Sequence, residues 1–235
     1  FSDFAGSSIV HSAGGWAALM GAVFLGPRIG KYGPDGKPRA IPGHNVGFAV
    51  VGVFVLWFGW FGFNAGSELA MDNWVAHCIT TTLLAGSAGV VGAGAAIWRK
   101  TGAMDVGMAG NGVLAGLVSI TAGTGTMSFA GSVAVGFIGG VIVVYSVLFI
   151  ERRGIDDPVG AVSVHGVCGA WGTLAIGLFA RYDDAFLGRD DAGLFYGGGF
   201  DQLLVQAIGV VIVAVWVLGT SAILFKVLKS TVGLR

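Results

Sequence analysis

The sequence predicts an all-α membrane protein, a polytopic bundle of apolar helices. Its 235 residues are 54% hydrophobic and 11% charged, with a mean hydropathy of +0.81, whereas about a quarter of the residues in soluble domains are charged. Its 43 glycines are typical of helices that pack closely in lipid. The apolar residues form long continuous blocks, which favours helices over a β-barrel with its alternating pattern.

Seven apolar blocks reach the length of about 20 residues that crosses a hydrocarbon core of about 30 Å. They are Phe4–Gly26, Val46–Ala65, Trp74–Trp98, Val106–Met127, Phe129–Ile150, Pro158–Ala180 and Leu203–Phe225. The fourth block is the least regular, because Thr121-Ala-Gly-Thr-Gly-Thr126 is a poor helix interior. Residues 27–45, which hold four of the five prolines, are expected to form an ordered connection.

The charged residues predict the orientation of these spans. Eleven of the 13 basic residues fall in alternate loops, hence on one side: Arg28, Lys31, Lys37, Arg39, Arg99, Lys100, Arg152, Arg153, Lys226, Lys229 and Arg235. The other side has Arg181 and Arg189 with Asp3, Glu68, Asp72, Asp183, Asp184, Asp190, Asp191 and Asp201. Because basic loops stay in the cytoplasm, we expect the start of the chain outside and its C-terminus inside.

One motif occurs twice, in oppositely directed spans. Asp3 precedes His11 by eight positions, and Asp157 precedes His165 by eight. Aligned on the histidines, Gly6 matches Gly160, Val10 matches Val164 and Gly15 matches Gly169. A motif repeated in opposite directions indicates an inverted-topology repeat, a fold whose site lies at the repeat interface near the membrane midplane.

A histidine inside a bilayer needs a partner or a cavity, because hydrocarbon offers its nitrogens no hydrogen bond. Two neutral imidazoles can bond to each other and still offer an edge to a small polar solute. The predicted boundaries leave His11 and His165 about 10 Å apart along the membrane normal, so helix tilt has to close the gap. A structural role remains the alternative. His44 is expected to be a loop residue and His77 a packing residue.

Carboxylates at the starts of spans have two interpretations. Asp3 either caps a helix or favours a cation at a pore entrance, and one buried carboxylate can do both. Asp156 and Asp157 are expected to be structural caps that interact with the helix dipole, with Pro158 in the first turn. The buried cysteines Cys78 and Cys168 are interpreted as small hydrophobic residues.

Aromatic residues and glycines alternate at the end of the second span, from Trp57 to Ser67. An interfacial aromatic belt explains most of this stretch. The dense glycines also fit rings that project into a cavity, where they bind a cation or gate the passage.

Four motifs in order resemble the Amt/Mep/Rh ammonium transporter family. They are Asp3-Phe-Ala-Gly with Val10-His11, the stretch Gly59–Ser67, Asp156-Asp157-Pro158 with Val164–Gly169, and Thr231–Arg235. The resemblance extends over residues 1–235 and implies one ammonium transporter domain. It also implies a fold of eleven spans with an inverted repeat, assembled as a homotrimer in the plasma membrane. This chain is similar to spans five to eleven, so four N-terminal spans are expected to precede it.

The resemblance implies roles for particular residues. His11 and His165 are similar to the twin histidines of the pore, and Phe63 to one of two stacked gate phenylalanines. Asp3 is similar to an acid near the ammonium recruitment site, and Ser67 to a hydroxyl at the outer mouth.

Further positions follow from the same resemblance. Trp60 is expected among the recruitment aromatics, and Thr121 is similar to a threonine beside the pore. In some relatives an acid stands where this chain has Gly160, so any role of that acid is not expected here. A tail beyond Arg235 binds PII-type regulators in the family.

The function expected is conduction of ammonium or ammonia across a lipid membrane, not enzymatic catalysis, without metal or cofactor. The zero formal net charge gives no electrostatic reason to expect nucleic acid. An ammonium sensor with the same pocket and an attached signalling domain is the main alternative. A haem protein with two histidine ligands and an intramembrane protease using Ser7 or Ser8 are weaker ones.

Overall fold

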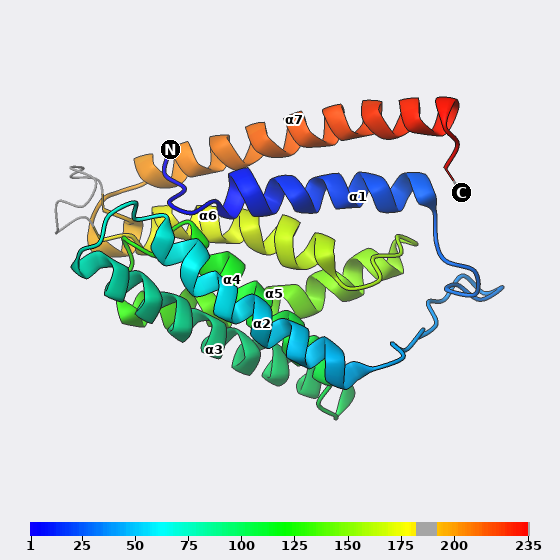
Figure 1. The fold of residues 1–235 in the computed structure, drawn as a ribbon, viewed down its shortest axis with the longest axis horizontal. Coiled ribbons are helices and arrows are strands. Elements are labelled where there is room, and N and C mark those ends of the chain that lie inside the picture. Colours follow the sequence, from blue (N-terminus) through cyan, green and yellow to red (C-terminus); the bar gives the residue numbers. More distant parts are fainter. Residues whose placement is uncertain (182–191, 235) are drawn as a thin grey trace.

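The computed structural model describes residues 1–181 and 192–234 (Figure 1). Its elements are η1 (Ser7–Ser12), α1 (Ala13–Leu25), α2 (Val46–Gly66), α3 (Asn73–Thr101), α4 (Val106–Thr121), α5 (Phe129–Arg152), η2 (Val162–Val167), α6 (Cys168–Phe179), η3 (Leu194–Tyr196) and α7 (Asp201–Thr231). The described part is helical, with isolated bridges in place of strands. Six of the charged residues used to predict the orientation lie outside the described residues: Asp183, Asp184, Arg189, Asp190, Asp191 and Arg235.

Six helical stretches in the described part are long and apolar enough to cross a membrane, and a seventh, α4, is shorter. The seven apolar blocks are thus all helical, but the prediction that the fourth runs to Met127 is wrong. This helix ends at Thr121, and the next residues form turns in which Gly123 and Met127 donate to the carbonyls of Ile120 and Gly123. The surrounding protein buries this non-helical backbone. Within a membrane, non-helical backbone occurs only where it is buried in protein or lines a water-filled cavity.

Helices α3, α4 and α5 pack closely against one another, on the side of the bundle away from α7 (Figure 1). A Cβ on Gly140 would overlap the backbone of Gly89, and a Cβ on Gly116 would overlap that of Ala85. Small residues let helices approach until their backbones touch. The resulting van der Waals contacts hold the helices together in lipid, where the hydrophobic effect does not drive helix association. The glycines predicted to serve packing therefore do so here.

Helices α1 and α7 lie side by side along one face of the bundle, and the start of the chain lies against the beginning of α7 (Figure 1). Many side chains of α7 and of α2 are apolar and exposed. Such surfaces suit lipid or other membrane helices.

The repeated motif has the same backbone in both copies. Each histidine lies in a six-residue π-helix, His11 in η1 and His165 in η2. Each π-helix follows a glycine in the left-handed region, Gly6 at φ 105° and Gly160 at φ 76°. Each then continues into an α-helix, α1 or α6. The sequence repeat is thus also a structural repeat, and π-turns occur often at functional sites.

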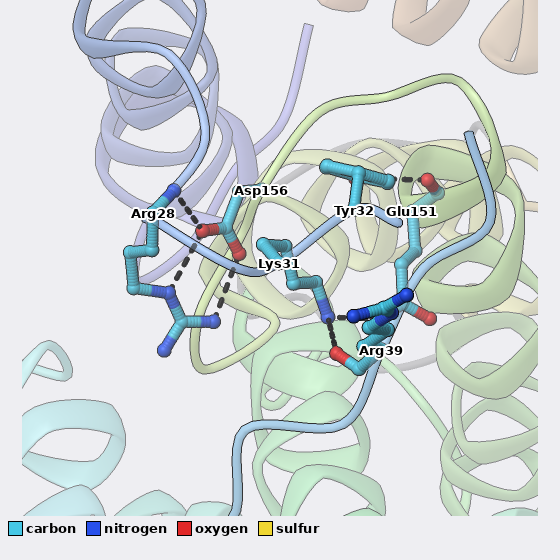
Figure 2. A network of polar contacts seen from close by, with 6 residues as sticks. All are labelled: Arg28, Lys31, Tyr32, Arg39, Glu151 and Asp156. Carbon is cyan, nitrogen blue, oxygen red and sulfur yellow. Dashed lines mark hydrogen bonds and ion pairs between the residues drawn. The ribbon is translucent and has the colours of Figure 1, made fainter. Parts of the chain in front are cut away.

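A polar network fixes the start of the connection after α1 (Figure 2). Arg28 pairs with Asp156, Lys31 pairs with Glu151, and the Tyr32 hydroxyl donates to the Glu151 carbonyl at 2.9 Å. These bonds join the loop to the end of α5 and to the turn that leads into η2. The expected ordered connection is therefore present in this part of the loop.

Candidate functional site

The two histidines meet at the interface between the repeats. His11 Nδ1 and His165 Nδ1 are 3.1 Å apart, and the ring centroids are 5.2 Å apart with planes at 24°. One ring must carry its proton on Nδ1 and the other must accept there. The rings therefore form one hydrogen-bonded pair, and the separation of about 10 Å that the predicted boundaries implied is absent.

Aromatic rings from α2 cover the His11 side of this pair. The Trp60 indole stacks on His11 with centroids 4.8 Å apart and planes at 14°, and Phe63 lies 5.5 Å from the same ring. Trp60 Nε1 donates to Thr121 Oγ1 at 3.0 Å, and Thr121 donates to the Leu117 carbonyl. Thr121, expected beside the pore, is thus fully buried and holds Trp60.

His11 keeps one nitrogen without a partner. Its Nε2 atom is buried, and no described residue forms a hydrogen bond with it. A buried polar atom without a partner costs about 1–3 kcal/mol, unless a solute or water bonds to it. This nitrogen is the position in the site where a small polar molecule would gain most.

Two aspartates hold the starts of the π-helices in matching ways. The Asp3 carboxylate accepts hydrogen bonds from the backbone nitrogens of Ser7, Ser8 and Ile9 at 2.6, 2.9 and 2.9 Å. Asp157 accepts from Ala161 and Val162 at 2.9 and 2.8 Å. Both have the geometry of caps, because a carboxylate that accepts these otherwise unpaired N–H groups stabilises the helix start.

Asp156 was expected to cap the helix, but it forms an ion pair with Arg28 instead. Its carboxylate, in a side chain only 2% exposed, accepts from Arg28 Nε at 2.7 Å, Nη2 at 2.9 Å and the Arg28 backbone nitrogen at 2.9 Å. These bonds hold the pKa of the Asp156 carboxyl below its usual value. Sequence reasoning missed this pair because nothing local relates residues 128 positions apart.

Of the remaining predicted positions, Phe63 and Ser67 lie at the C-terminal end of α2 and His77 lies in α3. The Ser67 hydroxyl donates to the Phe63 carbonyl at 2.7 Å, so its oxygen is free only as an acceptor. Phe63 is 38% exposed. His77 lies apart from the pair, with Nε2 3.0 Å from the Met127 carbonyl oxygen and its ring packed on Phe129. His44 is exposed in the loop before α2.

A buried polar layer beside the histidines was not predicted. Ser8 Oγ and Thr173 Oγ1 are 2.5 Å apart, and Ser7 Oγ donates to the Val118 carbonyl at 2.7 Å. Gln206 of α7, fully buried, bonds to the backbone of Ser2. The available signal was a glutamine inside an apolar span, where a buried amide requires partners.

Comparison with known proteins decides the family. The model of the Ammonium Transporter Family matches residues 1–235. The chain belongs to the ammonium transporter family. This family is named for transport rather than for a catalysed reaction, and the resemblance read from the four motifs is confirmed.

Members of the ammonium transporter family are similar to this chain in sequence. Ammonium transporter Amt2 of Archaeoglobus fulgidus is 48% identical over 238 residues, which cover 99% of this chain and 50% of that protein. Ammonium transporter 1 member 2 of Oryza sativa subsp. japonica is 38% identical over 245 residues, covering 97% of this chain and 49% of that protein. The chain thus spans about half the length of these relatives.

Solved structures of ammonium transporter family proteins share the fold. A structure described as "Sensor Amt Protein" superimposes with a TM-score of 0.92 at 40% identity, covering all of this chain and 56% of the other. The crystal structure of Candida albicans Mep2 superimposes with a TM-score of 0.88 at 31% identity, covering all of this chain and 52% of the other. The predicted fold class, a multi-pass helical membrane protein, is confirmed.

No cluster of three or more histidine, cysteine, aspartate or glutamate side chains that could hold a metal ion lies within residues 1–181 and 192–234. Cys78 and Cys168 are buried and free. The polar groups at the centre are two imidazoles and several hydroxyls, which can bind a small neutral or protonated nitrogen compound.

Proposed function

We propose that the protein conducts ammonium or ammonia across a membrane through a pore whose centre is the pair His11–His165. The observation that carries this proposal is the 3.1 Å contact between the two Nδ1 atoms, together with the buried His11 Nε2 that lacks a partner. Imidazole can accept a hydrogen bond from ammonia or exchange a proton with ammonium. Membership of the ammonium transporter family supports this choice of solute.

Energetic cost decides which species passes the centre. A bare cation at mid-membrane costs several kcal/mol even on lenient scales, whereas neutral ammonia does not carry this cost. Ammonium therefore loses its proton on the way in, and the neutral molecule and the proton pass along the imidazoles. Potassium has no proton to lose, so the same constriction rejects it.

Recruitment takes place on the His11 side. The Asp3 carboxylate caps η1, and in its charged form its field would favour a cation there. Trp60 and Phe63 offer aromatic faces beside His11, to which cations are attracted. The Ser67 oxygen retains its acceptor capacity.

The whole protein is proposed to follow the family's plan. The chain then forms one transporter domain, residues 1–235, equivalent to the last seven of eleven spans. The protein is a homotrimer in the plasma membrane, with the start of this chain outside and its C-terminus in the cytoplasm. The basic residues of alternate loops support this orientation. A PII-type regulator would bind a tail that follows residue 235.

The test is ammonium-elicited current from the full-length protein in liposomes on a solid-supported membrane. His11→Ala and His165→Ala should each lower the current about a hundredfold or more, the range for removing a proton-transfer group, or let potassium through. His44→Ala, in the exposed loop, should behave as the wild type. If both pore variants keep the wild-type rate and selectivity, the proposal is wrong.

An ammonium sensor is the second candidate, favoured by the likeness to a structure described as "Sensor Amt Protein". A sensor binds in the same pocket without passing the solute on. Isothermal titration with ammonium together with the liposome assay separates the two functions. Binding without current would favour the sensor, and current would favour the transporter.

A further inference from the structure

One buried amide on α7 needs a role. Gln206 is fully buried, although several neighbouring side chains of α7, such as Leu204, Ile208 and Val211, are apolar and exposed. An amide placed inside a membrane bundle is costly unless its donors and acceptor are all bonded. The partners of Gln206 therefore indicate what it is used for.

The amide of Gln206 is fully bonded, and its main partner is one residue. Ser2 N donates to Oε1 at 2.8 Å, and Nε2 donates back to the Ser2 carbonyl at 2.6 Å. Nε2 also donates to the Thr173 carbonyl of α6 at 3.0 Å. The side chain pairs with both backbone groups of Ser2, as a neighbouring strand would, and fixes that residue relative to α6 and α7.

A second contact holds the same segment. The Phe1 ring packs against Gly209, where a Cβ would overlap the ring. Gly209 lies three residues after Gln206, so both face the same side of α7. Helix α7 thus holds two consecutive residues, Phe1 and Ser2, directly before Asp3.

The second repeat has an equivalent arrangement. There the residue before the capping aspartate is Asp156, and Arg28 holds it with three hydrogen bonds. In each repeat a long side chain from another segment therefore fixes the residue that precedes the cap. Gln206 does this for Asp3, and Arg28 does it for Asp157.

We infer that Gln206 is a positioning residue for the ammonium-recruiting carboxylate. It holds Ser2, and thereby sets where Asp3 lies and how the π-helix with His11 begins. This inference rests on the proposed function, because it assigns Asp3 a role in recruitment. It makes α7, at the edge of the bundle, part of what determines affinity for the solute.

A double-mutant cycle in the full-length protein tests this role. Gln206→Leu should raise the half-saturating ammonium concentration about fivefold, within the range of couplings between neighbouring residues, and change the maximal current less than twofold. In an Asp3→Asn background the same substitution should add no further increase. An undiminished increase in that background would show that Gln206 does not act through Asp3 and would overturn the inference.

A matched control is available one turn earlier. Gln202 is also buried, but within the described residues its side chain forms only a long contact of 3.4 Å to Gln206 Oε1, so Gln202→Leu should leave the affinity within twofold of the wild type. Gly209→Ala provides a milder disturbance, because the added methyl group displaces only the Phe1 ring. It should raise the half-saturating concentration in the same direction but by less.

Amide hydrogen exchange separates failure of the inference from failure of the proposed function. Gln206→Leu should speed exchange at the nitrogens of Ser7, Ser8 and Ile9, which Asp3 caps, and Gln202→Leu should not. Unchanged exchange would overturn the positioning role. If Asp3→Asn leaves affinity unchanged while exchange responds to Gln206→Leu, recruitment by Asp3 is wrong and the positioning of the cap is supported.

Discussion

The Cα of Gly15 in α1 lies so close to the backbone of Gly166 in η2 that a methyl group on Gly15 would overlap the Gly166 nitrogen. The corresponding glycine of the second repeat, Gly169, lies in the same way against the Ser7 carbonyl. This mutual contact of two glycines with the opposite π-helix brings His11 and His165 within hydrogen-bond distance. The approach of the repeats is thus set by backbone contact.

Gly15→Ala should therefore separate the repeats. We expect a loss of about 1–3 kcal/mol in the free energy of unfolding, as for other overpacked sites, and a fall in ammonium current. Gly14→Ala is the matched control, because nothing lies within 4 Å of a Cβ at Gly14. The melting temperatures of the two detergent-solubilised variants measure the loss of stability, and the liposome assay measures the current. Equal melting temperatures for the two variants would contradict the contact.

Thr121→Val should act on the proposed site through Trp60, which stacks on His11. The substitution keeps the shape of the side chain but removes the acceptor for Trp60 Nε1, which leaves a buried donor unpaired at a cost of about 1–3 kcal/mol. The indole then loses its fixed stack on His11, and the transport rate should fall about threefold or more. Thr121→Ser keeps the hydroxyl and should retain the rate. A wild-type rate for the valine variant would argue against this role.

Asp156→Asn should weaken the connection between the loop and η2. Arg28 lowers the pKa of the Asp156 carboxyl in the folded protein, so the pair stabilises the fold at pH values above the ordinary aspartate pKa of about 3.9. This stabilisation is lost as the pH falls through the pKa that the Asp156 carboxyl has in the folded protein, which is the lower of the two pKa values. At pH 7 the variant should lose about 2 kcal/mol, and its deficit should shrink only below about pH 4.

Thermal unfolding between pH 3 and pH 8 measures the Asp156 effect. Asp35→Asn is the control, because Asp35 is exposed and lies 3.8 Å from Lys37. Exposed pairs contribute about 0–1 kcal/mol, so this variant should melt like the wild type at every pH. A deficit of Asp156→Asn that varied between pH 5 and pH 8 would contradict the assignment.

Glu151→Gln should be worse than removal of both charges. Lys31 is buried and pairs with Glu151, so the single substitution leaves a buried cation without its counter-ion, at a cost of up to about 3–5 kcal/mol. The double variant Lys31→Met, Glu151→Gln should recover part of that loss, because it removes the unpaired charge. Melting temperatures of the two variants decide this, and a lower value for the double variant would refute it.

Much of the fold could be read from local features of the chain. Hydropathy located the seven apolar helices, because the membrane requires long apolar segments wherever they occur. Spacing alone related Asp3–His11 to Asp157–His165, and both aspartates have the geometry of caps. The end of α4 was misplaced, because apolar composition continues through Gly123 and Met127 although the helix stops at Thr121.

The sequence by itself determined the family, the number of apolar helices and the repeated histidine motif, since each of these depends on the order of residues within one segment. Only the tertiary structure decided that the two imidazoles touch, that Asp156 belongs to Arg28 and that Gln206 holds Ser2. These contacts join residues 128 to 204 positions apart. Their geometry depends on how glycine-lined helices pack, which no local pattern specifies.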